Sequence, residues 1–324
     1  MAQAIRIYEA GSPDVLQFEQ VADPVPEAGE AVVRHQAIGV NFIDTYHRSG
    51  LYPLAHPHGL GIEASGVVEE VGAGVTDIKP GDRVAYAHPP TGAYSDRRTH
   101  NADYLVPVPD GVADDVAAAV LLKAMTVDFL VRRTFRVEPG MTVLLHAAAG
   151  GVGLMACQWL AHIGATVIGT VSSTEKAELA RNNGCTHTVI HSEEDFVERV
   201  KELTDGEGVP VVYDSIGKDT LTRSLDCLRP LGLMVSFGNA SGKPDPVDLG
   251  LLADRGSLRI TRPRLFDFVS NRADLLQSAS TVFDLVGRGV INAEIGQRFA
   301  LADAAEAHRA LEARRTTGST VLVP

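Results

Sequence analysis

The sequence predicts an α/β protein in which a barrel-like β domain is joined to a domain with a doubly wound parallel sheet. Three observations support this class. Roughly the first 120 residues carry short alternating apolar runs that glycine and proline turns interrupt. Strand and helix patterns then alternate along the chain. Within that alternation, residues 142–153 read as a strand, a glycine-rich turn and the start of a helix.

Length and composition are those of a soluble globular protein. The 324 residues suffice for about two domains, and contents of 45% hydrophobic and 22% charged residues are ordinary for this class. No apolar run approaches the ~20 residues that span a bilayer, and the N-terminus lacks a signal-peptide core. We therefore expect a cytoplasmic protein without membrane contact. The formal net charge of −12 argues against a nucleic-acid partner.

The elements of the β domain are predicted from alternation and from turns. Residues 30–34 and 64–71 alternate apolar and polar side chains, and glycine or proline turns follow at 72–74, 79–82 and 107–111. Short strands at this spacing indicate a compact barrel.

A helical pattern that runs from Asp114 through Leu130 is expected to carry the chain into the second domain. Beyond it we predict six strands, at 142–146, 166–170, 188–190, 211–214, 233–237 and 258–261. Helices between them begin near Gly151, Glu175, Asp195 and Thr220. The first of these helices shows one apolar face, made by Val152, Met155, Ala156, Trp159, Leu160 and Ile163. Strands in this order suit a parallel sheet with helices on both faces.

The C-terminal segment is predicted to return to the first domain. Helical patterns at 271–286 and 302–314 precede a strand at 318–323. The expected domain limits are therefore 1–122 plus 264–324 for the β domain and 123–263 for the parallel-sheet domain.

The turn Ala148-x-Gly150-x-x-Gly153 predicts a dinucleotide site. Small side chains let the backbone approach a pyrophosphate, and free N–H groups at a helix N-terminus favour its charge. The alternative is that the glycines serve only a tight strand-to-helix turn. The strand before the turn, the helix after it and the α/β context favour the dinucleotide.

The end of the next strand favours NADPH over NADH. An NAD site places Asp or Glu about 20 residues after the glycines, where this chain has Ser172 and Ser173 with Lys176 nearby. Hydroxyls and a cation suit a 2′-phosphate, and we expect the Glu175 side chain to point to solvent. In the alternative reading a serine caps the following helix and Lys176 is a surface residue; both roles are compatible.

Six motifs extend the argument to the whole chain. They are residues 41–53 (NFIDTY-x-x-SGLYP), 59–66, 79–84, 146–153, 212–217 and 232–239. In these motifs, and in their order, the chain resembles the zeta-crystallin-like quinone oxidoreductases, a zinc-independent branch of the medium-chain dehydrogenases/reductases. The resemblance implies a GroES-like β-barrel catalytic domain, a Rossmann domain, NADPH in a cleft between them, and a homodimer.

The resemblance also implies which residues bind the cofactor. Those on the nicotinamide side are Asn41, Phe42, Ile43, Asp44, Thr45 and Tyr46, with Leu130 also in the site. Gly151 and Val152 meet the pyrophosphate, while Ser172, Ser173 and Lys176 meet the 2′-phosphate. Ser215, Phe237, Gly238 and Asn239 border the nicotinamide and ribose. His191 stands where the family often has a tyrosine beside the adenosine, so it is expected to stack there or to add charge at low pH.

No metal is expected. Zinc enzymes of the wider superfamily use a cysteine where this chain has Asn41, and a Gly-His-Glu stretch where it has Gly61-Ile62-Glu63. The structural four-cysteine lobe is absent. Cys157, Cys185 and Cys227 are interpreted as buried small apolar residues.

Without a metal, the acceptor must take hydride without strong electrophilic help, which a quinone or an activated alkene does. Tyr46 and Tyr52 are candidate donors to the acceptor oxygen, or stacking partners, and packing alone is an equal alternative. Asn41 orients the cofactor or a water, or stabilises a turn. The leading function is an NADPH-dependent quinone reductase. The alternatives are a 2-alkenal or enone reductase and, more remotely, an RNA-binding or structural protein that retains the nucleotide fold.

Overall fold

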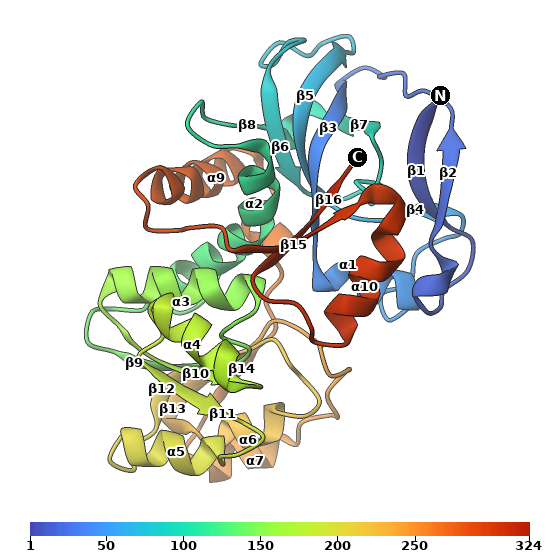
Figure 1. The fold of residues 1–324 in the computed structure, drawn as a ribbon. Helices are drawn as coiled ribbons and strands as arrows, with labels where there is room; N and C mark the ends of the chain where they lie inside the picture. Colours follow the sequence, from blue (N-terminus) through green and yellow to red (C-terminus); the bar gives the residue numbers. More distant parts are fainter. The chain divides into compact units, whose positions relative to one another are not determined.

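The chain folds into two compact units in the computed structural model, which describes residues 1–324 (Figure 1). The first unit comprises Met1–Met125, Val269–Gly289 and Ala293–Pro324. The second comprises Thr126–Phe268 and Val290–Asn292.

The first unit is built on two sheets whose strands pair antiparallel, except for β15 with β16. The larger sheet has the order β15-β16-β3-β5-β6-β8, with β7 also paired to β3. Its strands are β3 (Glu30–Val40), β5 (Glu63–Val71), β6 (Arg83–Ala87), β7 (Arg97–Asn101), β8 (Val106–Pro107), β15 (Ile295–Ala300) and β16 (Ser319–Val323). The smaller sheet has the order β2-β1-β4, formed by β1 (Ala2–Ile7), β2 (Gln17–Val21) and β4 (His58–Gly59).

The C-terminal strand of the chain lies in the larger sheet of this unit. β16 pairs antiparallel with β3, with Thr320 opposite Val40, and β15 pairs parallel with β16. The helices of the unit are α1 (Phe42–Ser49), α2 (Asp114–Asp128), α9 (Arg272–Gly287) and α10 (Ala304–Glu312), with 3₁₀ turns η1 (Pro13–Val15), η2 (Ala102–Tyr104) and η4 (Leu301–Asp303). The chain passes from the first unit to the second within α2, between Met125 and Thr126. A π-helix, η3 (Phe129–Thr134), follows α2 directly.

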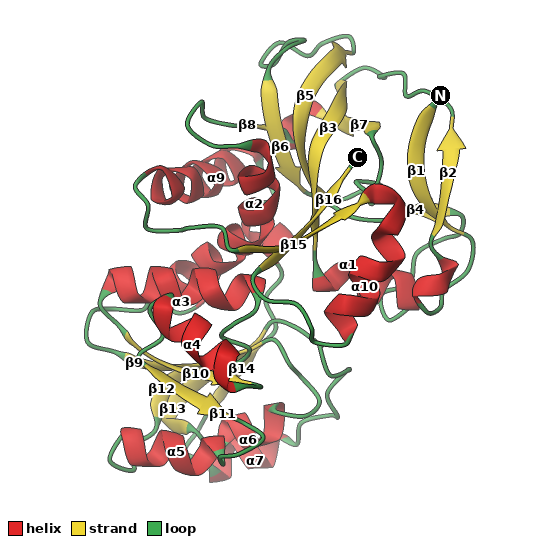
Figure 2. Ribbon diagram, in the orientation of Figure 1, coloured by secondary structure: helices red, strands yellow, loops and turns green.

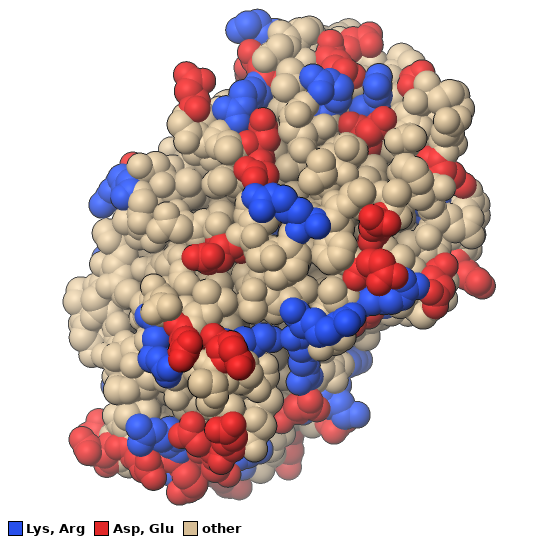
Figure 3. Space-filling view, in the orientation of Figure 1, with Lys and Arg blue, Asp and Glu red and all other residues tan.

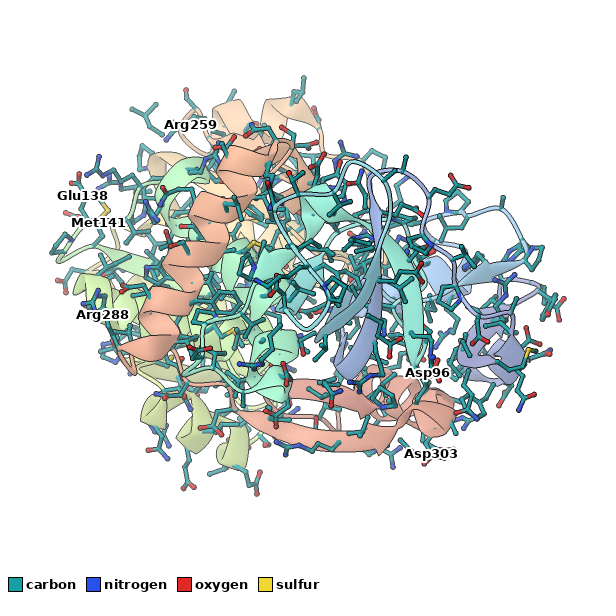
Figure 4. All side chains as sticks on the ribbon, turned by 90° about the horizontal axis from the view of Figure 1, so that it is seen from above. Asp96, Glu138, Met141, Arg259, Arg288 and Asp303 are labelled. Atoms are coloured by element: carbon teal, nitrogen blue, oxygen red, sulfur yellow. The ribbon has the colours of Figure 1, made fainter.

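Asp96 joins the two sheets of the first unit (Figure 4). Its N–H donates to the carbonyl of Gln3 in β1 at 2.9 Å, and its carboxylate accepts from the Gln3 N–H at 3.0 Å. Its own carbonyl accepts from His35 in β3 at 2.8 Å. Side chains of the strands bury a core that includes Ile5, Val33, Ile38, Val84 and Tyr86.

The second unit is the predicted parallel sheet. All neighbouring strands pair in parallel, in the order β11-β10-β9-β12-β13-β14. They are β9 (Thr142–Leu145), β10 (Thr166–Val171), β11 (His187–Ile190), β12 (Val209–Asp214), β13 (Leu228–Ser236) and β14 (Arg259–Thr261). The order runs outward from β9 on one side and from β12 on the other, which is the doubly wound topology with its switch point between these two strands.

Helices cover both faces of this sheet (Figures 1 and 2). On one face lie α3 (Gly151–Ile163) and α4 (Thr174–Asn182); on the other lie α5 (Phe196–Leu203) and α6 (Leu221–Leu225). Two short helices, α7 (Leu249–Asp254) and α8 (Leu265–Phe268), flank β14 in the chain. The core includes Leu144, Ile168, Val212 and Met234. Acidic side chains gather over α5 (Figure 3).

α3 is buried on more than the one face predicted from its sequence. Leu154 and Cys157 are buried, and both lie outside the predicted stripe. The turn before β11 packs against this flank, because a Cβ on Gly184 would lie 3.0 Å from the Cys157 carbonyl oxygen. No helix of the structure is long and apolar enough to cross a membrane.

Two buried histidines make the first unit sensitive to acid. Nδ1 of His35 donates to the Ser95 carbonyl (2.7 Å), so Nε2 of the neutral ring accepts from the Tyr86 hydroxyl (2.9 Å), while neither ring nitrogen of His100 has a partner. Burial lowers the pKa of His35 to about 4 and that of His100 to about 2. Because the unfolded chain binds protons at these positions below pH ~6.5 and the folded chain does not, stability is retained above that pH and lost below it.

We predict that His100→Phe makes the protein less sensitive to acid. An aromatic ring is kept at the place where the tilted His100 ring lies 4.4 Å from that of Tyr86, and the buried group that must stay neutral is removed. Below pH ~6.5, the free energy of unfolding of His100→Phe should rise relative to that of wild type by about 1.4 kcal/mol for each pH unit. Urea denaturation at several pH values measures this, with the exposed His162→Gln as control. Parallel pH curves for wild type and His100→Phe would contradict the prediction.

Candidate active site

Most of the predicted site residues of the second unit lie at the carboxyl edge of its sheet. Each follows the end of a strand, and parallel strands bring their carboxyl ends to one edge. Gly151 and Val152 follow β9, Ser172 and Ser173 follow β10, His191 follows β11, Ser215 follows β12, and Phe237, Gly238 and Asn239 follow β13. Lys176 lies in the first turn of α4. Leu130 lies in η3, where its carbonyl accepts from the Tyr213 hydroxyl of β12 at 3.3 Å.

The turn after β9 has the shape that a phosphate group needs. Ala147 adopts a left-handed φ of 55°, and a Cβ on Gly153 would overlap the Ala147 carbonyl oxygen. α3 then begins at Gly150 as N-cap, without a side-chain cap, whereas Ser173 caps α4 and Asp195 caps α5. The first N–H groups of α3 therefore have no side-chain cap, which suits a pyrophosphate. Glu138 and Met141 lie near the amino end of β9, away from this turn (Figure 4).

The end of β10 supports both roles considered for its serines. The Ser173 hydroxyl accepts from the Lys176 N–H at 3.3 Å, so the capping alternative is confirmed. Glu175 is exposed, as expected, and a hydrogen bond from Ser173 is the main cause that lowers its pKa. The contact of Ser172, Ser173 and Lys176 with a 2′-phosphate stays a prediction.

A buried polar network, which sequence reasoning missed, braces the switch point. Asp214 ends β12; its carboxylate accepts from the N–H groups of Ile216 (2.7 Å) and Gly217 (3.0 Å). It also accepts from the hydroxyls of Thr220 (2.7 Å) and Ser224 (3.3 Å). Because Asp214 is fully buried, these four donors take the place of water. The motif at 212–217 contains Asp214, but nothing in the sequence marks it as a bracing residue.

His146 extends this network across the sheet. Its Nε2 lies 2.9 Å from the Ser224 hydroxyl, and its Nδ1 lies 2.9 Å from the Thr170 hydroxyl in β10. Burial lowers its pKa, although the Asp214 carboxylate partly opposes this. The ends of β9, β10 and β12 are thereby linked through side chains beneath the glycine-rich turn.

The loops after β12 and β13 fit closely together. A Cβ on Gly238 would overlap the carbonyl oxygen of Ser215, so only glycine allows this approach. The guanidinium of Arg262, next to β14, donates to the Gly238 carbonyl at 2.8 Å and to the Ser236 hydroxyl at 3.0 Å. Arg262 is a cation at this edge that the sequence analysis did not single out.

In the first unit, the predicted nicotinamide-side residues form the N-terminal turns of α1. The Asn41 N–H donates to the Asp44 carboxylate at 2.9 Å, and the Asn41 side-chain amide donates to Glu63 at 2.8 Å. Asn41 therefore stabilises the turn, which was one of its two predicted roles. Phe42 and Ile43 are half-buried.

The aromatic residues of α1 and of the following loop contact one another. The Tyr46 and Tyr52 rings meet edge to face at 5.2 Å between centroids, and Phe42 lies 6.2 Å from Tyr46. The Thr45 hydroxyl donates to the Phe42 carbonyl at 2.7 Å. The ring contact supports the packing role, and the predicted donor role of each tyrosine stays a prediction.

A chain of hydrogen bonds links Arg48 to the Asp44 carboxylate through His308 and Tyr94. Arginine only donates, so Arg48 donates to Nδ1 of His308 (3.2 Å) and the imidazole proton lies on Nε2. Nε2 then donates to the Tyr94 hydroxyl (3.0 Å), which donates to the Asp44 carboxylate (3.0 Å). Arg48 is itself held by both carboxylate oxygens of Glu312, at 3.0 and 2.5 Å.

This chain opposes the effect of burial on Asp44. Burial raises the pKa of Asp44 to about 7, while the donors Asn41 and Tyr94 and the charge of Lys123 act to lower it. One carboxylate oxygen of Asp44, Oδ1, is buried and has no partner. The first turn of α1 therefore carries a carboxyl group that titrates near neutral pH.

The three cysteines are buried and unpaired, and all lie in the second unit. No group of three or more His, Cys, Asp or Glu side chains is arranged to hold a metal ion.

The chain matches two family models. Residues 27–110 match the alcohol dehydrogenase GroES-like domain, and residues 151–280 match the family described as zinc-binding dehydrogenase. It is 53% identical to a quinone oxidoreductase of Pseudomonas aeruginosa over 325 residues, which cover 100% of both chains. It is 49% identical to a 2-haloacrylate reductase of a Burkholderia species over 334 residues, which cover 100% of this chain and 99% of the relative.

A solved structure shows the same architecture. The crystal structure of Escherichia coli quinone oxidoreductase complexed with NADPH is 47% identical, covers 100% of both chains and superposes with a TM-score of 0.98.

We predict that Asp214→Ala lowers the free energy of unfolding by about 3 kcal/mol, because four buried donors lose their acceptor. Asp214→Asn should cost less, since one acceptor oxygen remains and the two hydroxyls can rotate to accept. Urea denaturation measures both, with the exposed Asp219→Ala as control. A loss below about 1 kcal/mol for Asp214→Ala would show that the network does not brace the switch point.

Proposed function

The chain belongs to the zeta-crystallin-like quinone oxidoreductases of the medium-chain dehydrogenase/reductase superfamily, and from this we propose that it is an NADPH-dependent quinone reductase that works without a metal. The observation that carries the proposal is the uncapped start of α3 behind a turn that only glycine permits at Gly153, at the switch point of a parallel sheet. Full-length similarity to quinone oxidoreductases supports the acceptor class.

The preference for NADPH rests on the end of β10. No carboxylate stands at the strand tip where an NAD enzyme holds the ribose hydroxyls, and Ser172, Ser173 and Lys176 offer donors instead. Glu175 is exposed at the surface. The relative of known structure is complexed with NADPH, which agrees with this assignment.

When bound, NADPH supplies the hydride, and the residues of the chain orient the reactants. The N–H groups at the start of α3 hold the pyrophosphate, and Ser215, Phe237, Gly238 and Asn239 border the ribose and nicotinamide. In the first unit, the residues from Asn41 to Tyr46 line the nicotinamide side, with Asn41 fixed by Asp44 and Glu63. Asn41 and Ile62 stand where the zinc enzymes carry ligands, so these positions supply no Lewis acid.

A second function is supported by one of the relatives. The 2-haloacrylate reductase is 49% identical and matches over the full chain, so an activated alkene is the second candidate acceptor. We further propose, from the family resemblance, a cytoplasmic homodimer. Sedimentation velocity tests the dimer.

The proposed function is tested first on the cofactor. Wild-type protein should bind NADPH at least tenfold more tightly than NADH. Gly153→Ala should lose that binding, because its Cβ would overlap the Ala147 carbonyl. Gly287→Ala is the control, because Gly287 is also a helical glycine, is exposed, and would place its Cβ in open space. Fluorescence titration measures all three proteins. Failure of the wild type to bind NADPH would favour a structural or RNA-binding protein.

The acceptor is then tested with a panel of quinones and 2-alkenals under NADPH. The proposal expects kcat/KM to be highest for a quinone. Higher values for alkenals would instead favour the alkene reductase.

The two tyrosines are tested by removing one hydroxyl at a time. If a phenol donates to the acceptor oxygen, Tyr46→Phe or Tyr52→Phe should lower kcat with a quinone by about tenfold to a hundredfold. NADPH affinity should stay within threefold of wild type, because the ring contacts at 5.2 Å are retained. Stopped-flow oxidation of NADPH measures the step. Unchanged turnover in both variants would assign the two residues to packing.

A further inference from the structure

A buried ion pair lies beside the α1 turn. Lys123 of α2 places its ammonium 3.3 Å from the carboxylate of Glu63 in β5. The side chain of Lys123 is 6% exposed and that of Glu63 is 0% exposed. Lys201 and Glu198 form a second Lys–Glu pair at this distance, but their side chains are 47% and 68% exposed.

The Glu63 carboxylate is fixed by three donors. Its Oε1 accepts from the Leu122 N–H at 2.7 Å, and its Oε2 accepts from the Asn41 amide at 2.8 Å as well as from Lys123. Gly39 makes room for it, since a Cβ there would overlap Oε2. Glu63 is therefore a rigid acceptor whose hydrogen-bonding capacity is taken up within the protein.

The Lys123 ammonium, in contrast, has donors left over. An ammonium carries three N–H donors, and Lys123 has one hydrogen-bond partner, Glu63. Burying such an ion pair does not favour stability over an apolar pair of the same volume. Two N–H groups of this buried ammonium are therefore available to a further acceptor, and an acceptor that binds there during function would explain why the cation is retained.

The position of the ammonium ties it to the proposed site. Lys123 and Asn41 share the same carboxylate oxygen of Glu63. Lys123 also acts on Asp44, whose pKa its charge lowers and the charge of Glu63 raises. The cation thus lies among the residues that hold the first turn of α1, the segment assigned to the nicotinamide side.

We propose that Lys123 is a catalytic residue whose ammonium donates a hydrogen bond to the acceptor oxygen that becomes negatively charged during reduction. This inference rests on the proposed function. The acceptor gains a hydride and its two electrons from NADPH, which is oxidised to NADP⁺, and the resulting oxyanion takes one proton from Nζ of Lys123. The amine regains its proton from water. Glu63 is the positioning residue that aims the ammonium.

The first experiment compares charge removal with charge retention. Lys123→Met should lower kcat with a quinone by about a hundredfold, the loss typical of removing one donor to a developing oxyanion, and leave NADPH affinity within threefold of wild type. Lys123→Arg should recover part of the loss. Lys201→Met is the matched control, because it removes an exposed ammonium from an equally close glutamate; its activity should equal wild type.

Lys123→Met leaves the Glu63 carboxylate buried without its counter-ion, so loss of folding has to be separated from loss of chemistry. The double variant Glu63→Gln/Lys123→Met removes both charges and keeps a neutral pair of similar size. Its melting temperature should be close to that of wild type, and its kcat with a quinone should still be about a hundredfold lower. Recovery of wild-type turnover in the double variant would overturn the proposal.

A binding measurement gives a readout that does not depend on turnover. 4-Nitrophenol is a probe of the oxyanion site because its ionised form absorbs differently from its neutral form. Wild-type protein with NADP⁺ should bind the phenolate in preference to the phenol, and so lower the apparent pKa of the bound probe. Lys123→Met should abolish that preference, whereas a purely structural lysine would leave it unchanged.

The outcomes separate the two proposals. If wild-type protein reduces neither quinones nor alkenals with NADPH, the proposed function fails and the assignment of Lys123 fails with it. If wild type is active and Lys123→Met keeps its rate and its phenolate preference, only the assignment of Lys123 fails.

Discussion

The buried carboxylate of Asp214 is the contact on which the second unit's candidate site depends. It accepts four hydrogen bonds at the end of β12 and, through Ser224 and His146, reaches the hydroxyl of Thr170 in β10. This fixes the strands on both sides of the switch point. The glycine-rich turn lies directly after His146, so these side chains hold the backbone from which α3 begins without a side-chain cap.

The first unit uses buried carboxylates in the same way, with one difference. Glu63 is saturated by Leu122, Asn41 and Lys123, whereas Asp44 keeps one oxygen unpartnered and has its pKa raised by burial to about 7. The chain from Arg48 to Tyr94 is directional, because an arginine cannot accept and so fixes the tautomer of His308. It therefore acts as a support for Asp44 and not as a route for protons from the surface.

Much of the fold could be predicted from local patterns, and the site networks could not. The strand predicted at 142–146 is observed at Thr142–Leu145, one residue shorter. It could be predicted because an apolar run bounded by turn residues is a local signal. The predicted residues of the second unit gather at one edge for the same reason, since each follows a strand. The bracing contacts join residues far apart in sequence, such as Arg48 and Glu312, 264 positions apart. Periodicity and motifs carry no information about such pairs, which is why Lys123, Asp214 and Arg262 were not singled out.

The two acceptor classes named by the relatives place the same demand on the protein. Hydride addition to a quinone or to an activated alkene leaves negative charge on a conjugated oxygen, so one well-placed cationic donor serves both. A site built in this way discriminates between acceptors mainly by the shape and polarity of the surrounding surface. Under the proposed function, that surface is made by the ring contact of Tyr46 with Tyr52 and by the half-buried Phe42 and Ile43. Substitutions there should change the choice of acceptor, whereas changes at Lys123 should lower the rate with every acceptor.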